Sequence, residues 1–327
     1  MKEVIFHIGL HRCGSTAVQN LLRHNQPALQ AKGLHCLFRP RLQKHAVLSQ
    51  LFHLYRWHAF WPFPRLQLPK LAAEINRVGP VIISEENLPG PMLGVRNFRH
   101  YPTSDRFFGA VASLDAHLDL PVRLVMTIRR QDRLIESLYA FRVTRGYTEN
   151  FNDFVARLRL DDFYASRYLL AAEKAGLQQQ LHISVLEDMS AATVGDMFGL
   201  PLDGAPAGNR SLGPDQLNLW RALVLQGVVF PKGKPRQAVV DFLRSISGLP
   251  GRQALTAAAK AAGVAISDEQ AASALQQAAD MESPLFDDHA RAALLARYRA
   301  DNAAFLASPA VLASPGVWDQ KTSGTSQ

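Results

Sequence analysis

The stretch that decides the fold runs from residue 3 to residue 22 and reads EVIFHIGLHRCGSTAVQNLL. Its apolar beginning, Val4 to Ile8, is typical of a short buried strand, and the residues after Gly14 have the apolar spacing of a helix. Gly9 and Gly14 bound a four-residue loop between the two. A strand, a tight loop and a helix in this order form a phosphate cradle, because loop N–H groups and the positive helix end point at one anion. The stretch therefore predicts an α/β protein with an anion site early in the chain.

The loop differs from an ATP-binding P-loop at one important position. In that motif the second glycine is followed by Lys and then by Ser or Thr. Here Ser15 follows Gly14, Thr16 comes next, and the cation lies inside the loop as Arg12. The lysine that would reach the β- and γ-phosphates is therefore absent from its place. The loop predicts phosphate binding but not ordinary ATP chemistry.

This loop resembles the 5′-phosphosulfate-binding loop of sulfotransferases that use 3′-phosphoadenosine 5′-phosphosulfate (PAPS), in its bacterial and carbohydrate-type forms. The resemblance implies a P-loop-type three-layer fold, with a central, mainly parallel sheet flanked by helices. It also implies donor binding by Leu10, His11, Arg12, Cys13, Gly14, Ser15 and Thr16. Many relatives have Lys where this chain has Arg12, and Arg stays charged without serving as a proton donor. Family members with Arg at this place imply that the role survives.

A second junction of strand and helix supports the resemblance. Residues Val122 to Ile128 are strand-like, Arg129 follows them, and Ser137 lies eight residues later in a predicted helix. A guanidinium and a hydroxyl placed there can bind one phosphate at several oxygens. The family's 3′-phosphate motif is similar, with Tyr139 at the matching position two residues after the serine. The alternative is a basic strand end beside a surface serine.

A third predicted strand, residues 80–84, ends in Glu85 and Glu86. Ligands of open α/β sheets bind beyond the carboxyl ends of the strands, so a carboxylate there can act as a general base. A helix-capping or ion-paired acid is the alternative. The family carries a Glu followed three residues later by Pro, which Glu86 and Pro89 match. Glu86 is therefore the expected base and Glu85 the second choice.

We expect residues 1–306 to form one sulfotransferase-like α/β domain, with a helical, aromatic-rich insertion at about 34–75 and an Ala-rich helical insertion at about 215–285. Aromatic residues within 34–69 would form an acceptor wall or a packed helical flap. Residues 92–110 would line the acceptor side or form a solvated loop. Arg210, in a Gly- and Pro-rich loop, is a candidate nucleotide clamp. Residues 308–327 are predicted to be a disordered tail.

Composition limits the classes of ligand and the cellular compartments that fit this chain. The chain has 327 residues and a formal net charge of +8, which favours anionic ligands without choosing among them. Cys13 and Cys36 are its only cysteines, too few for a disulfide framework or a structural zinc site, and no metal is expected. No apolar run approaches the ~20 residues of a membrane span, and the run after Glu3 is too short for a signal peptide. We expect a cytoplasmic protein, with at most peripheral membrane contact.

Together these patterns favour a transferase that moves a sulfuryl group from PAPS to an acceptor hydroxyl, with PAP (adenosine 3′,5′-bisphosphate) as product. The positive charge and the aromatic segment favour a glycan or a glycolipid as acceptor, with a small alcohol, a phenol or a peptide tyrosine as alternatives. Arg12 would neutralise charge on the leaving oxygen and Glu86 would take the acceptor proton. A P-loop small-molecule kinase is one alternative. A non-catalytic polyanion-binding protein is another, although no nucleic-acid motif is present and no nucleic-acid partner is expected.

Overall fold

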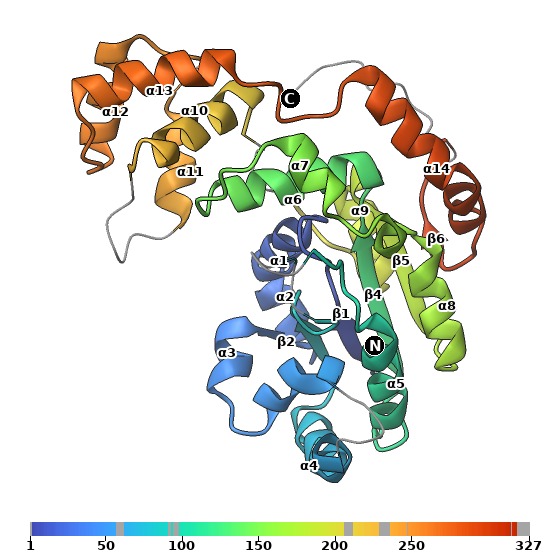
Figure 1. Cartoon of the computed structure of the whole chain (residues 1–327). Helices are drawn as coiled ribbons and strands as arrows, with labels where there is room; N and C mark the ends of the chain where they lie inside the picture. The colour runs from blue at the N-terminus through green and yellow to red at the C-terminus, as the bar shows by residue number, and fades with distance from the viewer. Residues whose placement is uncertain are drawn as a thin grey trace.

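The fold is built on one six-stranded, all-parallel sheet. The computed structural model describes residues 2–56, 62–90, 93, 98–205, 212–228, 236–246, 248–314 and 316–318, without the side chains of 62–66 and 236–237. The strand order is β2-β3-β1-β4-β5-β6 (Figure 1). The strands are β1 (Val4–His7), β2 (His35–Phe38), β3 (Val81–Ser84), β4 (Val122–Ile128), β5 (Leu181–Val185) and β6 (Val311–Leu312). The α/β class with a mainly parallel sheet is thereby confirmed.

The central strands are continuous apolar runs because both of their faces are covered. All four residues of β1 and of β3 are buried, and β1 pairs with β3 on one side and β4 on the other. Ile5 faces one core, whereas Val4 and Phe6 face the other. This alternation follows from the two-residue period of a strand.

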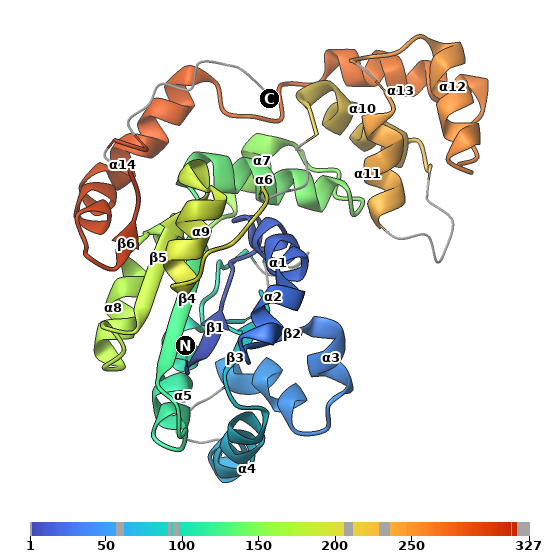
Figure 2. The same ribbon diagram turned by 180° about the vertical axis from the view of Figure 1, so that it is seen from behind.

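Helices cover both faces of the sheet and make three layers (Figure 2). The Ile5 face packs against α1 (Ser15–His24), α2 (Gln26–Ala31) and α9 (Ala191–Phe198). The other face is covered by η1 (Leu48–Arg56), α4 (Pro62–Val78), α5 (Ser104–Asp115), α6 (Gln131–Val143), α8 (Ser166–Lys174) and α14 (Asp288–Leu306). Shorter elements are α3 (Arg39–Lys44), α7 (Phe151–Ala156), η2 (Leu160–Phe163) and η3 (Leu186–Asp188).

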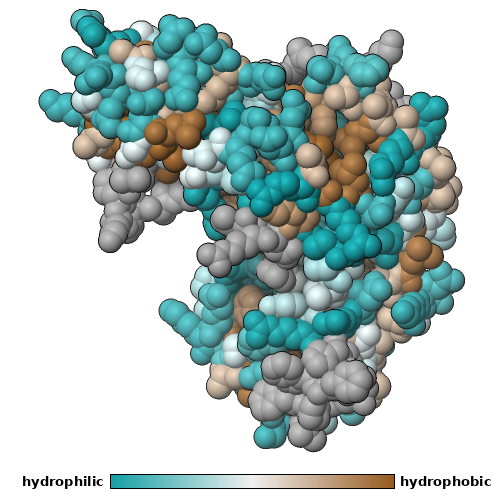
Figure 3. Space-filling view, in the orientation of Figure 1, coloured by the Kyte–Doolittle hydropathy of each residue, from teal (hydrophilic) through white to brown (hydrophobic). Residues whose placement is uncertain are grey.

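Four further helices form an arm that stands away from the sheet (Figure 1). They are α10 (Pro214–Leu225), α11 (Arg236–Arg244), α12 (Arg252–Ala261) and α13 (Asp268–Asp280). Helix α10 packs against α13 and against α6 of the body. In the space-filling view the arm overhangs a recess at the side of the body, and the visible surface is mostly hydrophilic (Figure 3). The helical character expected for residues 215–285 is found in all four helices.

Two parts of the chain differ from expectation. Residues 34–75 were expected to be a helical insertion, but β2 is a strand of the main sheet, while α3, η1 and α4 are the helical elements in the described part of this segment. Within the expected disordered tail, β6 pairs with β5 and Trp318 is buried. Pairing with a distant strand, and not local sequence, creates β2 and β6.

None of the helices that the structure describes combines the length and the apolar character needed to span a bilayer.

Candidate functional site

Three loops meet at the carboxyl edge of the sheet, around β1. The chain places β3 on one side of β1 and β4 on the other, so the direction of winding changes there. A change of winding opens a crevice at the strand ends, where open α/β sheets bind ligands. Residues 8–14 follow β1, residues 85–90 follow β3, and Arg129 and Arg130 follow β4. The sequence-predicted residues of all three segments therefore lie at one edge.

The loop after β1 is tightly closed against α1. A Cβ on Gly9 would lie 2.6 Å from Cβ of Ser15, so only glycine lets the helix begin this close to the strand end. Arg12 has a φ of 68° and Gly14 a φ of 85°, both in the left-handed region. A non-glycine residue there is strained by about 1 kcal/mol or more and persists only where its surroundings fix it. The Arg12 side chain is fixed by Nε, which donates to Oγ of Ser137 at 2.9 Å.

Arginines gather beside this loop. Burial, together with the charges of Arg129 and Arg244, lowers the pKa of Arg12 to about 10 against the opposing effect of Glu86. Arg129 Nε is buried without a hydrogen-bond partner among the described residues, and its nearest carboxylate oxygen, on Glu187, is 3.7 Å away. An anion that binds beside these positive charges would reduce the repulsion between them. The cluster of Arg12, Arg129 and Arg244 is called the loop arginine cluster below.

Glu86 contacts the loop at His11 and contacts Ser15 at the start of α1. Its Oε2 accepts from Ser15 Oγ at 2.8 Å, and its Oε1 lies 3.3 Å from His11 Nδ1. Burial raises the pKa of Glu86, but interactions with His11, Ser15 and Arg39 outweigh this and lower it to about 2. Glu86 is therefore ionised at neutral pH and anchors the loop. To accept a proton efficiently it needs a higher pKa, which a nearby bound anion would provide.

Glu85 has a different environment. It is buried, and its carboxylate forms a two-point ion pair with Arg39 of α3. Its Oε1 also accepts from the backbone N–H of Asn87 at 2.9 Å. These partners hold Glu85 away from the loop, so Glu86 is the carboxylate that faces the predicted anion site.

The sequence did not single out two residues that position the loop. The hydroxyl of Tyr101 accepts from the backbone N–H of His11 at 2.7 Å, and its ring stacks on the imidazole of His11. Asn87 Oδ1 lies 3.0 Å from His11 Nε2. Tyr101 belongs to the basic 92–110 segment, and its φ of 46° is a backbone feature that composition does not reveal.

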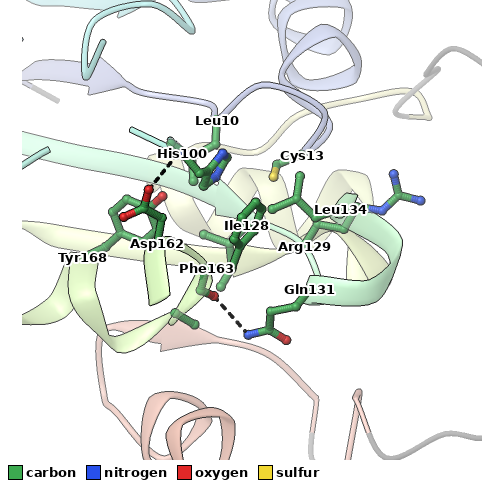
Figure 4. Close-up of a pocket in the computed structure, with 11 residues that line it drawn as sticks. Leu10, Cys13, His100, Ile128, Arg129, Gln131, Leu134, Asp162, Phe163 and Tyr168 are labelled. Carbon is green, nitrogen blue, oxygen red and sulfur yellow. Dashed lines mark hydrogen bonds between the residues drawn. The ribbon is translucent and has the colours of Figure 1, made fainter. Parts of the chain in front are cut away.

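A small cavity lies beneath the loop (Figure 4). Leu10 and Cys13 of the loop lie on one side, with His100 and Tyr168 from other elements. Its volume is about 20 Å³, room for one water molecule. Both ring nitrogens of His100 and the hydroxyl of Tyr168 are buried without partners among the described residues. Figure 4 shows the guanidinium of Arg129 directed away from these groups.

Burial sets the charge of the groups around this cavity. It raises the pKa of the Cys13 thiol to about 12, against the opposing effect of Arg129, so the thiol is protonated. It lowers the pKa of His100 to about 3, so that imidazole is neutral. Cys13 is therefore unsuited to act as a nucleophile, and its side chain packs in the core.

The remaining predicted site residues are buried, exposed or outside the part of the chain that the structure describes. Leu10 is buried beneath the loop, and Thr16 is exposed in the first turn of α1. Tyr139, matched to the 3′-phosphate motif, is buried and donates to the backbone carbonyl of Glu149 at 2.9 Å. Arg210 lies outside the described residues, as do the side chains of Trp57, His58, Phe60, Trp61 and Phe63. Within the described part of the aromatic segment, η1 packs against α5.

Among the residues that the structure describes, no three His, Cys, Asp or Glu side chains are grouped to hold a metal ion. Comparison with family models, with curated proteins and with solved structures gave no match for this chain.

Proposed function

We propose that this protein is a sulfotransferase that moves a sulfuryl group from PAPS to an acceptor hydroxyl, within a P-loop-type α/β fold. The observation that carries the proposal is the convergence of Arg12, Arg129 and Ser137. These residues come from two separate strand ends and the following helix, yet Arg12 bonds Ser137 and is electrostatically coupled to Arg129. A cationic site beside a glycine-bounded loop without the usual lysine suits a donor with phosphate groups at two positions.

Donor binding divides between the two strand ends. Backbone N–H groups of residues 10–16, with the hydroxyls of Ser15 and Thr16, would bind the 5′-phosphosulfate at the start of α1. Arg129 and Ser137 would bind the 3′-phosphate. On arrival of that phosphate, Ser137 would exchange its bond to Arg12 for one to the ligand. Arg210 remains the predicted clamp.

The reaction requires one bond to form and one to break. The acceptor oxygen attacks sulfur, and the bond between sulfur and the bridging oxygen of the 5′-phosphate breaks, leaving PAP and a sulfate ester. Arg12 would stabilise the negative charge that grows on the bridging oxygen, as donors aimed at developing charge do. Glu86 would receive the acceptor proton once the bound donor has raised its proton affinity. The proposed acceptors are hydroxyls of a glycan or glycolipid.

Calorimetric titration with PAP and with adenosine 5′-monophosphate tests the donor site. We expect PAP to bind more tightly than the monophosphate, because only PAP has a 3′-phosphate. Arg129→Ala should weaken PAP binding by at least about tenfold, since hydrogen bonds to charged groups contribute about 1.5–3 kcal/mol. The monophosphate should bind this variant as it binds the wild type.

Arg297→Ala is the matched control, because Arg297 of α14 forms an exposed ion pair with Asp161 of η2. It should leave both affinities unchanged. Equal binding of the two nucleotides by the wild-type protein would contradict the assignment of Arg129 and Ser137. If neither nucleotide binds to the wild-type protein, the proposed function is contradicted.

A small-molecule kinase is the second candidate, and one observation favours it. Ser15 Oγ donates to Glu86 at 2.8 Å, and a loop hydroxyl beside a strand-end carboxylate is a pairing that can hold Mg²⁺ in phosphoryl transfer. Titration with ATP in the presence and absence of Mg²⁺ separates the candidates. Mg²⁺-dependent ATP binding tighter than PAP binding would favour the kinase.

A further inference from the structure

Arg167 of α8 binds the turn that precedes α5. Its Nη1 donates to the backbone carbonyls of His100 at 3.0 Å and Asp162 at 2.7 Å. Its Nη2 donates to the carbonyl of Tyr101 at 3.0 Å and to Oγ of Ser104 at 3.2 Å. A guanidinium is a planar fork of N–H donors, so these bonds fix the directions of their acceptors. Arg167 therefore holds this turn in one conformation.

Tyr101 has an unfavourable backbone conformation inside the turn. Its φ is 46°, in the left-handed region, and the residue is fully buried. A non-glycine residue keeps such a conformation only where its surroundings fix it. Arg167 binds the carbonyl of Tyr101 and that of the preceding residue, His100. The N–H of His100 also donates to Oδ2 of Asp162 at 3.0 Å (Figure 4). The conformation of Tyr101 thus depends on contacts with α8 and η2.

The hydroxyl of Tyr101 contacts two of the strand-end loops at one point. It accepts from the backbone N–H of His11, in the loop after β1, at 2.7 Å. It donates to the backbone carbonyl of Glu86, in the loop after β3, at 3.5 Å. A phenol has one O–H and two lone pairs, so it can make both bonds. The hydroxyl thus links the predicted anion-binding loop to the loop that carries the proposed base.

We propose that Arg167 and Tyr101 are positioning residues of the anion site. Arg167 holds Tyr101 in place, and the Tyr101 hydroxyl holds the loop after β1 against the loop after β3. Both residues act through the loop backbone and not by contact with the anion. Without the hydroxyl, the N–H of His11 loses its acceptor, and the loop can move to conformations in which its donors no longer converge. Only the identity of the anion, the phosphosulfate of PAPS, rests on the proposed function.

Tyr101→Phe tests the link between the loops, because phenylalanine keeps the ring and removes only the hydroxyl. The probe is inorganic sulfate, whose binding is followed by nuclear magnetic resonance titration of the loop amides. Loss of one hydrogen bond should lower the sulfate affinity roughly two- to tenfold. The amide hydrogen of His11 should also exchange with solvent faster than in the wild type. An unchanged affinity or an unchanged exchange rate would overturn the proposal, as would a wild-type protein that does not bind sulfate.

Arg167→Met tests the role of the arginine, with Arg123→Met as the matched control. The two side chains are 20% and 21% exposed, and each donates to several acceptors. Arg123 lies near the start of β4, at the end of the strands opposite the loops. Both substitutions should lower the stability towards urea, but only Arg167→Met should lower the sulfate affinity. An equal loss of affinity in the two variants would overturn the assignment of Arg167.

The double variant tests whether Arg167 acts through Tyr101. If it does, the protein with both Tyr101→Phe and Arg167→Met should bind sulfate about as tightly as the weaker of the two single variants. Changes at two independent sites would instead multiply their effects on affinity. Effects that multiply would therefore overturn the proposed role of Arg167.

Titration with PAP and adenosine 5′-monophosphate separates this inference from the proposed function. Tyr101→Phe should weaken both nucleotides by a similar factor, because the loop would bind the 5′ group of each, whereas Arg129→Ala should weaken PAP alone. A protein whose sulfate affinity depends on Tyr101 but that has no preference for PAP would retain this inference and lose the proposed function. A protein that prefers PAP, with sulfate binding unchanged in Tyr101→Phe, would do the reverse.

Discussion

Arg129 and Arg130 are neighbours in the chain but belong to two different kinds of arginine cluster. Arg130 is buried, donates twice to Asp132 at 2.7 and 3.0 Å, and donates to the carbonyl of Trp318. Arg129 has a buried Nε without a hydrogen-bond partner in the described part of the chain and a carboxylate only at 3.7 Å. One arginine is fully paired by the protein, and the other retains capacity for a ligand.

The paired region extends into a network joining β4, α6 and α14. Arg291 of α14 donates to Asp132 and, at 2.6 Å, to Glu136. Asp132 and Glu136 are buried. In the loop arginine cluster, by contrast, the charges of Arg129 and Arg244 add to burial in lowering the pKa of Arg12. The carboxylates of the chain satisfy Arg130, whereas Arg129, whose Nε has no hydrogen-bond partner among the described residues, can bind an anion.

The largest effect is expected in the paired network. Asp132→Ala would remove the carboxylate that the buried Arg130 shares with Arg291, and breaking a buried ion pair costs about 3–5 kcal/mol. Urea unfolding should show this loss of stability. Asp161→Ala, which breaks an exposed pair with Arg297, is the control and should cost less than about 1 kcal/mol. Equal losses would show that Arg130 and Arg291 find other acceptors.

An intermediate effect, dependent on pH, is expected at Glu86. Its pKa is about 2 against an ordinary value of 4.5, a difference equivalent to roughly 3 kcal/mol of stabilisation at neutral pH. Because the folded-state pKa is the lower one, this contribution is present above pH 4.5 and lost as the pH falls towards 2. The stability difference between wild type and Glu86→Gln should therefore be greater at pH 7 than at pH 3. A difference that is constant with pH would show that ionisation of Glu86 does not stabilise the fold.

The smallest effect on stability is expected at Arg129. Arg129→Ala removes a charge that repels Arg12 and loses only the 3.7 Å contact with Glu187. The free energy of unfolding should change by no more than about 0.5 kcal/mol, although the same variant is expected to weaken PAP binding. Urea unfolding of the free protein measures it. A loss near that of Asp132→Ala would contradict the contrast between the clusters.

The sequence pattern predicted the strands and the loop whose structure depends on neighbouring residues in the chain. The strands β1, β3 and β4 are apolar runs, and the loop after β1 is bounded by glycines where a close approach and a left-handed φ require them. The strand β6 has only two residues, and its existence depends on pairing with β5. No periodicity can reveal so short a strand.

The candidate site shows the same division. The sequence identified Arg12, Ser137 and Glu86 separately, but Arg12 and Ser137 are 125 residues apart, and only the sheet order brings them into contact. The distinction between Glu85 and Glu86 depends on which side of the strand end each carboxylate faces. Tyr139 fitted the motif equally well by spacing, yet it packs in the core and binds a backbone carbonyl.

The pairing of Trp318 bears on how the end of the chain can be altered. Its indole N–H donates to Glu187 at 3.1 Å, its carbonyl accepts from Arg130, and its ring stacks on Phe305. Glu187 also accepts from the backbone N–H of Arg130 and is the carboxylate nearest Arg129. Shortening the chain before Trp318 would remove a donor and an acceptor at the junction that carries both arginines. A purification tag should therefore be added after residue 318, and should not replace Trp318 or the residues before it.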